Sequence, residues 1–248
     1  MQWIVFKWLL LILSAGLISS ATATTWGQEE VEDPFIAGAT CKVSSPASYG
    51  SYIYHWPSKY DQVFWPYTDG HGIWYCEQSG FISFMPDFAT LKDADKAAIQ
   101  SYLNQQAQTT LNNQQRLERL EAINALRSFD QDHRNLLLRV YARWQQDLGD
   151  FAQARAYRKL AFQAIKRRLD GQLTEAQRLE YLYLAGVYAQ YFSQTEASQQ
   201  YIEQLTQATK TLSDEELAGY AEYLIALSAE TRFITPQGKL DPELPQQE

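Results

Sequence analysis

The two cysteines are the residues in this chain whose type and spacing most clearly suggest chemistry. Cys41 begins the run Cys-Lys-Val-Ser, and Cys76 begins the run Cys-Glu-Gln-Ser-Gly-Phe. Each run is similar to one knuckle of a zinc ribbon, in which two CxxC turns supply four thiolates to one metal ion. Ser44 and Ser79 stand where the second thiolates would be, and a serine hydroxyl is a poor ligand for structural zinc. We therefore predict no metal and no cofactor.

Histidines and aspartates between residues 55 and 87 offer a second kind of chemistry. The candidates are His55, Asp61, Asp69, His71 and Asp87. A pair of carboxylates among them could hydrolyse a glycan, although nothing in their spacing requires it. The sequence contains no G-x-S-x-G elbow, no H-E-x-x-H pair and no phosphate-binding loop. A non-enzymatic protein is therefore the prediction, and a hydrolase that uses residues 55–87 is an alternative.

Aromatic side chains give a third possibility. Thirteen of the fifty residues from 41 to 90 are aromatic. Four of them could form an exposed platform that stacks on sugar rings or on a peptide, and these are Trp56, Tyr60, Trp65 and Tyr67. A glycan- or peptidoglycan-binding module is therefore another alternative. However, a lobe with few aliphatic residues must build its core from rings, so a core role for these residues is favoured.

The elements that would position these residues are short strands. Residues 49–54, 63–65, 73–76 and 81–84 have β-type composition, and prolines and glycines punctuate them. Asp69-Gly70 is a turn signal that predicts a hairpin. Residues 41–90 are thus expected to form a small β-rich aromatic lobe with degenerate zinc-ribbon knuckles.

The composition changes after this lobe. Between residues 91 and 234 Ala, Leu, Gln, Glu and Arg dominate, as is typical of a helical array. Capping-box signals that begin at Thr174, Ser193 and Ser213, together with helical periodicity, predict seven helices, at residues 92–108, 112–127, 131–147, 151–169, 174–191, 194–211 and 214–231. Two stretches resemble tetratricopeptide-type helix pairs. The prediction is an α+β fold, mostly α, with an irregular tetratricopeptide-like domain, and an ordinary helical bundle is the alternative.

Positive charge is concentrated in part of this helical region. Nine basic residues and only two acidic ones lie between residues 134 and 168, although the whole chain has a net charge of −8. A patch of one sign can steer association with an acidic partner protein, and a solvated helix face is the simpler interpretation. The candidate partner-binding residues are Arg143, Arg155, Arg158, Lys159, Lys166, Arg167 and Arg168. The acidic balance of the chain argues against nucleic-acid binding.

The N-terminus predicts export. Residues 1–23 have a charged start, an apolar run of about 11 residues and the small-residue site Ala-Thr-Ala, as in a signal peptide. The run is too short to span a bilayer, so no membrane association is expected after cleavage. We predict a periplasmic or extracellular protein with a flexible acidic leader at 24–40 and an irregular tail at 235–248.

Taken together, the two knuckles and the helical half resemble an uncharacterised bacterial family, a domain of unknown function. Its members pair an N-terminal cysteine-knuckle region with tetratricopeptide-like helices. The matching runs begin at Cys41, Trp74, Asp87, Tyr141, Leu148 and Glu180. The family pattern implies four thiolates, from which this chain departs at both serines, and the family carries no established activity to transfer.

A zinc-ribbon scaffold would bring its two knuckles together, so Cys41 and Cys76 should lie close in space without a metal. In an oxidising compartment such a pair favours a structural disulfide, which is the prediction. A mixed zinc site with His55 and His71 is one alternative. A monothiol redox site at Cys76-x-x-Ser79 is another, although residues 73–75 read as a strand rather than the helix start that such a site uses.

Overall fold

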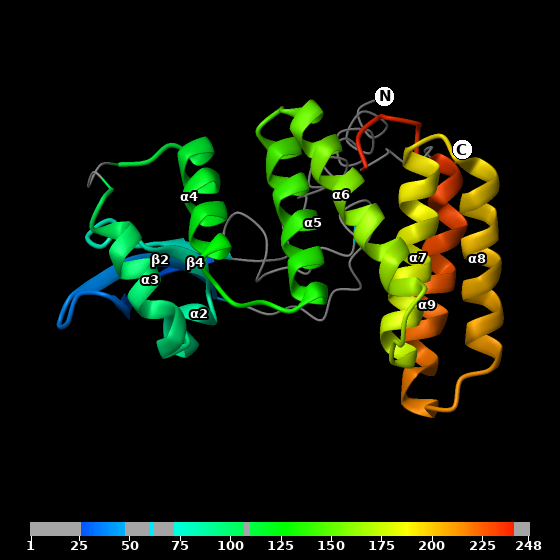
Figure 1. The fold of residues 1–248 in the computed structure, drawn as a ribbon, viewed down its shortest axis with the longest axis horizontal. Coiled ribbons are helices and arrows are strands. Elements are labelled where there is room, and N and C mark those ends of the chain that lie inside the picture. The colour runs from blue at the N-terminus through cyan, green and yellow to red at the C-terminus, as the bar shows by residue number, and fades with distance from the viewer. Residues whose placement is uncertain (1–25, 48–59, 62–71, 107–109, 241–248) are drawn as a thin grey trace, which may run out of the picture.

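The computed structural model describes residues 26–47, 60–61, 72–106 and 110–240. Of the described residues 61% are helical, and the described strands form two small antiparallel sheets of two strands each. The predicted fold class, α+β and mostly α, is therefore confirmed. Figure 1 shows the strands and the first helices at one end of the molecule, with α7, α8 and α9 side by side at the other. A tetratricopeptide-like repeat stays a prediction.

The strands form two hairpins. They are β1 (Trp26–Glu32), β2 (Thr40–Pro46), β3 (Ile73–Tyr75) and β4 (Ile82–Phe84). The predicted strands at 73–76 and 81–84 are confirmed, and they pair with each other. The predicted strands at 49–54 and 63–65, and the Asp69-Gly70 turn, lie outside the described residues.

The prediction of a flexible leader at 24–40 is wrong for strand β1. Residues 26–32 pair with β2 over its whole length, and Val31 lies opposite Cys41. Sequence periodicity could not find this strand because it is largely exposed and polar, with Val31 packed against the core. Backbone hydrogen bonds to β2, rather than a buried apolar face, hold it in place.

The helices follow the predicted order closely. They are α2 (Asp87–Thr90), α3 (Asp93–Leu103), α4 (Asn113–Ala125), α5 (Gln131–Asp147), α6 (Phe151–Leu169), α7 (Glu175–Tyr191), α8 (Thr195–Lys210) and α9 (Ala218–Ser228). Short 3-10 helices, Glu215–Leu217 and Ala229–Phe233, flank α9. The helix predicted at 214–231 is thus shorter than expected, while α5 and α6 have the predicted bounds.

Capping explains where several helices begin. The predicted capping box at the start of α7 is present, with Thr174 and Gln177 bonded reciprocally. The box predicted from Ser193 is absent, because Ser193 adopts a left-handed conformation (φ 64°) just after α7. The Ser213 box is also absent, since the backbone N–H and hydroxyl of Ser213 bind the Glu175 carboxylate instead.

Two hydrophobic clusters form the core of the described residues. The boundary between them does not coincide with the predicted domain boundary at residue 90. The first contains the strands, α3, α4 and one face of α5, whereas the second contains residues of α6 to α9. Tyr60 belongs to the second cluster although it precedes α5 by 71 positions in the chain. From the predicted tail at 235–248, residue Leu240 is also fully buried in the second cluster. The region expected to form a separate aromatic lobe therefore contributes to both cores.

Candidate functional site

Three arginine side chains from α5 and α6 surround one aspartate. Arg158 Nε donates a hydrogen bond to Asp61 Oδ2 over 3.2 Å, and Arg143 Nη2 lies 3.7 Å from Asp61 Oδ1. Arg139 Nη1 donates to the backbone carbonyl of Asp61 over 2.8 Å. All three guanidinium groups are buried, and Asp61 is completely inaccessible to solvent. We call Arg139, Arg143 and Arg158 the arginine pocket.

The helix pair α5–α6 positions the pocket. Arg139 and Arg143 are four residues apart, so they lie on one face of α5. The turn after α5 has Gly149 at φ 86°, where a glycine avoids the strain of a side chain. Asp150 then caps α6 by accepting from the backbone N–H of Gln153. The chain thus reverses within a few residues, which brings Arg158 of α6 beside α5.

Helix α7 closes the pocket. Glu180 Oε1 forms an ion pair with Arg139 Nη2 at 3.2 Å. The Arg158 guanidinium lies over the ring of Tyr191, 5.4 Å from its centroid. Burial by itself would lower the pKa of Arg158, but the nearby Asp61 carboxylate raises it above its ordinary value. The guanidinium therefore stays charged in the interior, because a buried cation is tolerated when an anion and hydrogen-bond acceptors accompany it.

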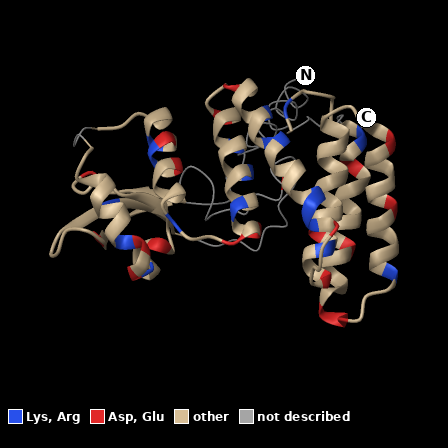
Figure 2. Cartoon of the chain, in the orientation of Figure 1, with Lys and Arg blue, Asp and Glu red and all other residues tan. Residues whose placement is uncertain are grey.

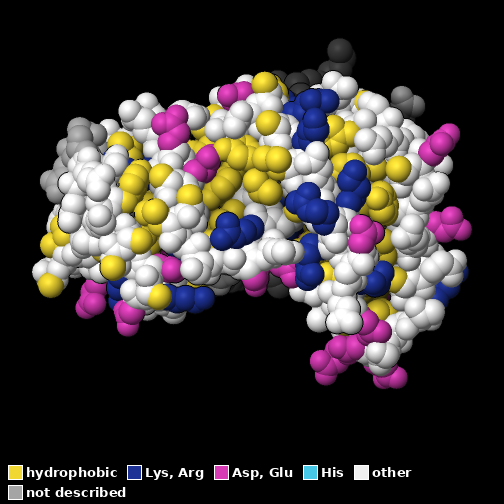
Figure 3. Space-filling model, viewed as in Figure 1, with side chains coloured by type: hydrophobic (Ala, Val, Ile, Leu, Met, Phe, Trp, Pro, Cys, Tyr) yellow, Lys and Arg dark blue, Asp and Glu magenta, His cyan; other side chains and the backbone are white. Residues whose placement is uncertain are grey.

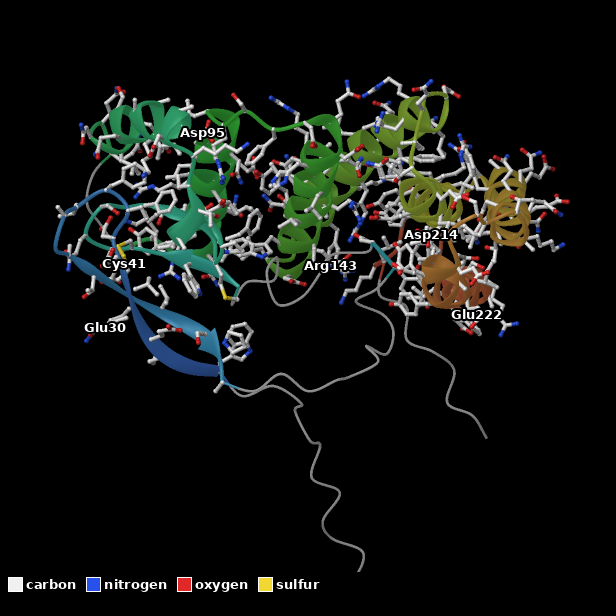
Figure 4. All side chains as sticks on the ribbon, turned by 90° about the horizontal axis from the view of Figure 1, so that it is seen from below. Glu30, Cys41, Asp95, Arg143, Asp214 and Glu222 are labelled. Carbon is white, nitrogen blue, oxygen red and sulfur yellow. A yellow bond between two sulfur atoms is a disulfide. The ribbon has the colours of Figure 1, made fainter. Side chains whose placement is uncertain are left out.

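The ligand of this pocket is a short segment of the same chain. Tyr60 and Asp61 are both fully buried, with the Tyr60 ring in the second hydrophobic cluster. The helices that bind Asp61 follow it by 78 and 97 positions. In Figure 4, Arg143 lies near the middle of the molecule, well away from Cys41 among the strands. The pocket therefore binds a segment that is distant in sequence through both its carboxylate and its backbone.

The pocket retains unused hydrogen-bonding capacity. Among the described residues, Arg158 Nη2 and the hydroxyls of Tyr183 and Tyr188 are buried without a hydrogen-bond partner. Burial raises the pKa of both tyrosines, so their hydroxyls remain protonated donors. Buried donors are costly when unsatisfied.

The predicted basic surface is divided by the structure. Arg143 and Arg158 turn inward into the arginine pocket, so they do not form a solvent-facing patch. Arg168 binds Asp132 through two hydrogen bonds of 2.8 and 3.0 Å. These bonds hold the pKa of Asp132 below its usual value, against the opposing effect of burial. The sequence could not distinguish buried from exposed arginines. A count of basic residues in a stretch of sequence includes those on the inner and on the outer side of a helix alike.

The four remaining basic residues are exposed on α6, and we call them the α6 basic stripe. They are Arg155, Lys159, Lys166 and Arg167. Figure 2 marks Lys and Arg positions in blue along the ribbon of α6, and Figure 3 shows Lys and Arg side chains gathered on the same part of the surface. Arg155 lies over the Phe192 ring and Lys166 over the Phe162 ring, at 5.3 and 4.7 Å. Cation–π contacts of this kind restrict where the charges point.

The predicted disulfide is present. Cys41 and Cys76 are bonded, with their Cα atoms 5.0 Å apart, and both side chains are buried. The two runs differ in conformation, however. Residues 76–81 form a knuckle-like turn with Gly80 at φ 76°, whereas Cys41 and Ser44 lie within strand β2. The first run is therefore not a knuckle, contrary to the prediction from its spacing.

Asp33 is a member of this site that sequence reasoning missed. Its Oδ1 accepts from the backbone N–H groups of Phe35 and Ile36, and its Oδ2 lies 2.9 Å from Cys76 Sγ. The side chain is 6% exposed. The only sequence signal was Asp33-Pro34, a pair that favours turn initiation, and it gave no indication that the turn approaches a cysteine.

Several other candidates can be placed. Tyr60 is buried, so it is not part of an exposed aromatic platform. Asp61 is bound by the arginine pocket, and Asp87 by Arg127 at 2.6 and 2.7 Å. The other members of the platform and of the hydrolytic set lie outside the described residues, namely His55, Trp56, Trp65, Tyr67, Asp69 and His71.

Comparison with known proteins gives no further guidance, since no family model, no curated protein and no solved structure matches the chain. The resemblance to a cysteine-knuckle family therefore stays a prediction. Within the described residues, none of the helices is both long enough and apolar enough to cross a membrane.

The arginine pocket makes Asp61 a strong determinant of stability. Asp61→Asn keeps the side-chain volume but removes the charge that the buried Arg143 and Arg158 guanidinium groups share. We expect it to lower the free energy of unfolding by about 3–5 kcal/mol, as when one partner of a buried ion pair is removed. Urea denaturation at pH 7 measures this change. Asp170→Asn, at an exposed aspartate, is the control and should change stability by less than about 0.5 kcal/mol. Equal effects of the two substitutions would contradict the assignment.

Proposed function

We propose that the chain is a non-enzymatic, exported scaffold whose helical array binds an acidic segment of a partner protein. The observation that carries this proposal is the arginine pocket. The array already binds an acidic residue distant in sequence, its own Asp61, through a backbone carbonyl and a carboxylate. Recognition of this kind combines charge with main-chain contacts, as protein domains do when they bind peptides.

The α6 basic stripe is the surface that remains for the partner. Its four charges lie on the solvent side of the helix whose inner side contributes Arg158 to the pocket. Leu160, which is 50% exposed, follows Lys159 on α6 and offers an apolar side chain beside the stripe. A surface that combines fixed positive charges with an exposed leucine fits a segment that carries acidic and apolar side chains.

One observation supports export. A disulfide joins Cys41 to Cys76, and such bonds persist mainly in oxidising compartments. The predicted signal peptide at 1–23 lies outside the described residues. The glycan-binding alternative is weaker, because Tyr60 of its proposed platform is buried.

The export proposal predicts a processed N-terminus. If the signal peptide is cleaved after Ala23, the mature protein begins at Thr24, and mass spectrometry of the protein from its native source measures this directly. An intact Met1 N-terminus on cytoplasmic protein would contradict export.

The binding proposal predicts that charge reversal on the α6 basic stripe weakens association with an acidic peptide. The probe is a labelled peptide Glu-Glu-Tyr-Asp-Glu-Glu, and its amide counterpart Gln-Gln-Tyr-Asn-Gln-Gln is the reference. Converting the four stripe residues to Glu should raise the dissociation constant by about tenfold or more, because each exposed charge pair contributes a few tenths of a kcal/mol. Fluorescence anisotropy at low and physiological salt measures the change.

A matched control reverses four exposed basic residues elsewhere. They are Lys42, Lys92, Arg178 and Lys210. This variant has the same net charge as the stripe variant, so it separates a local effect from a global one, and its affinity should exceed that of the stripe variant by about tenfold. The proposal is wrong if both variants lose affinity equally, if the amide peptide binds as well, or if the wild-type protein does not bind the acidic peptide.

A further inference from the structure

A second site lies at the opposite end of the molecule, around the disulfide. A cleft of about 670 Å³ between β2 and β3 is lined by Cys41 together with largely polar side chains. Of the two bonded cysteines, Cys41 lines the cleft and Cys76 does not. A reagent that enters the cleft would therefore meet Cys41 rather than Cys76. The volume is within the range of small-molecule sites.

The cleft has a positive wall. Lys42 and Arg116 both line it, and the Arg116 guanidinium is held over the Tyr75 ring at 4.9 Å. Among the described residues, Arg116 Nε is buried without a hydrogen-bond partner. Glu77 is the one acidic residue among those that line the cleft. A small anion, rather than a cation, suits this lining.

Behind the disulfide lies a buried carboxylate. Asp33 Oδ2 is 2.9 Å from Cys76 Sγ, yet a disulfide sulfur has no hydrogen to donate. In the reduced protein the Cys76 thiol could donate to this oxygen, and a hydrogen bond to a charged acceptor is stronger than one to a neutral acceptor. Asp33 therefore favours the dithiol over the disulfide, because it gains a donor on reduction and faces a sulfur without one on oxidation.

From these contacts we propose that Cys41–Cys76 is an exchangeable disulfide that accepts electrons from a small anionic thiol bound in the β2–β3 cleft. Cys41 is the sulfur attacked, and Asp33 is the positioning residue, which accepts a hydrogen bond from the Cys76 thiol once that sulfur is protonated. This site is independent of the arginine pocket and of the α6 basic stripe.

The exchange balances in two steps. The substrate thiol loses its proton, and its thiolate attacks Cys41 Sγ to form a mixed disulfide. The Cys41–Cys76 bond breaks, its electron pair stays on Cys76 Sγ, and Cys76 takes up the released proton and donates it in a hydrogen bond to Asp33. A second substrate thiolate attacks the substrate sulfur of the mixed disulfide, and Cys41 leaves as a thiolate that water protonates. Overall, two thiols become one disulfide and the protein gains two electrons and two protons.

The first test uses glutathione, a small anionic thiol, on the folded full-length protein. Wild-type protein, Asp33→Asn and Asp170→Asn are equilibrated at fixed ratios of reduced to oxidised glutathione, then alkylated and weighed. Asn retains the acceptor oxygen of the turn, and Asp170→Asn is the matched control at an exposed aspartate outside the cleft. Asp33→Asn should require about tenfold more reducing conditions for half-reduction, whereas Asp170→Asn should match the wild type. An unchanged equilibrium in Asp33→Asn, or reduction of the wild type only in urea, would overturn the proposal.

The second test does not depend on Asp33→Asn being folded. Cys76→Ser and Cys41→Ser each leave one thiol, and each is incubated with oxidised glutathione while circular dichroism monitors the fold. Cys41 in the first variant should form the mixed disulfide at least about tenfold faster than Cys76 in the second, since only Cys41 lines the cleft. In the wild type, glutathione should reduce the disulfide faster than the cationic thiol cysteamine does. Equal rates at the two cysteines, or faster reaction with cysteamine, would refute the assignment of the cleft.

Discussion

The interaction on which the structure depends most is the burial of one carboxylate among three arginines. A buried guanidinium is destabilising unless its charge and its donors are satisfied, and here three of them lie in the core between α5, α6 and α7. Asp61 supplies a carboxylate and a backbone carbonyl to them, and Glu180 supplies a second carboxylate. The helical array and the segment that contains Tyr60–Asp61 must therefore fold together. A chain without this segment would leave the pocket open at the centre of the array.

A second link ties the N-terminal hairpins to each other. The disulfide joins β2 to the residue after β3, and it closes a loop of 35 positions. On the chain-entropy model, closing such a loop stabilises the folded state by about 4 kcal/mol. Asp33 acts against this gain, since it presents an oxygen to a sulfur that cannot donate. A disulfide with a purely structural role does not require a carboxylate beside its sulfur. The destabilising contact from Asp33 therefore suggests that the disulfide also reacts.

The helices were predictable because their signals are local. Capping residues and apolar periodicity fixed α5 and α6 to the residue, and the capping box at Thr174 fixed the start of α7. Strand β1 was missed because its backbone pairing with β2 stabilises it, whereas its own side chains show no strand pattern. The disulfide was predictable from the cysteine count and the expected compartment. The arginine pocket was not, since nothing in the sequence shows that Asp61 meets side chains nearly a hundred positions away, or that Arg158 faces inward while Arg155 faces solvent.

The most direct test of this account is a double-mutant cycle between Asp61 and Arg158. Asp61→Asn, Arg158→Met and the double variant are compared with the wild type by urea unfolding, and the coupling free energy isolates the pair from each side chain's other contacts. We expect the two substitutions to be coupled by about 2 kcal/mol or more, because Asp61→Asn alone leaves the buried Arg158 guanidinium without its carboxylate, whereas the double variant has no guanidinium at position 158. Effects that add within about 0.5 kcal/mol would show that the two residues do not depend on each other, and would contradict the arginine pocket as the centre of the fold.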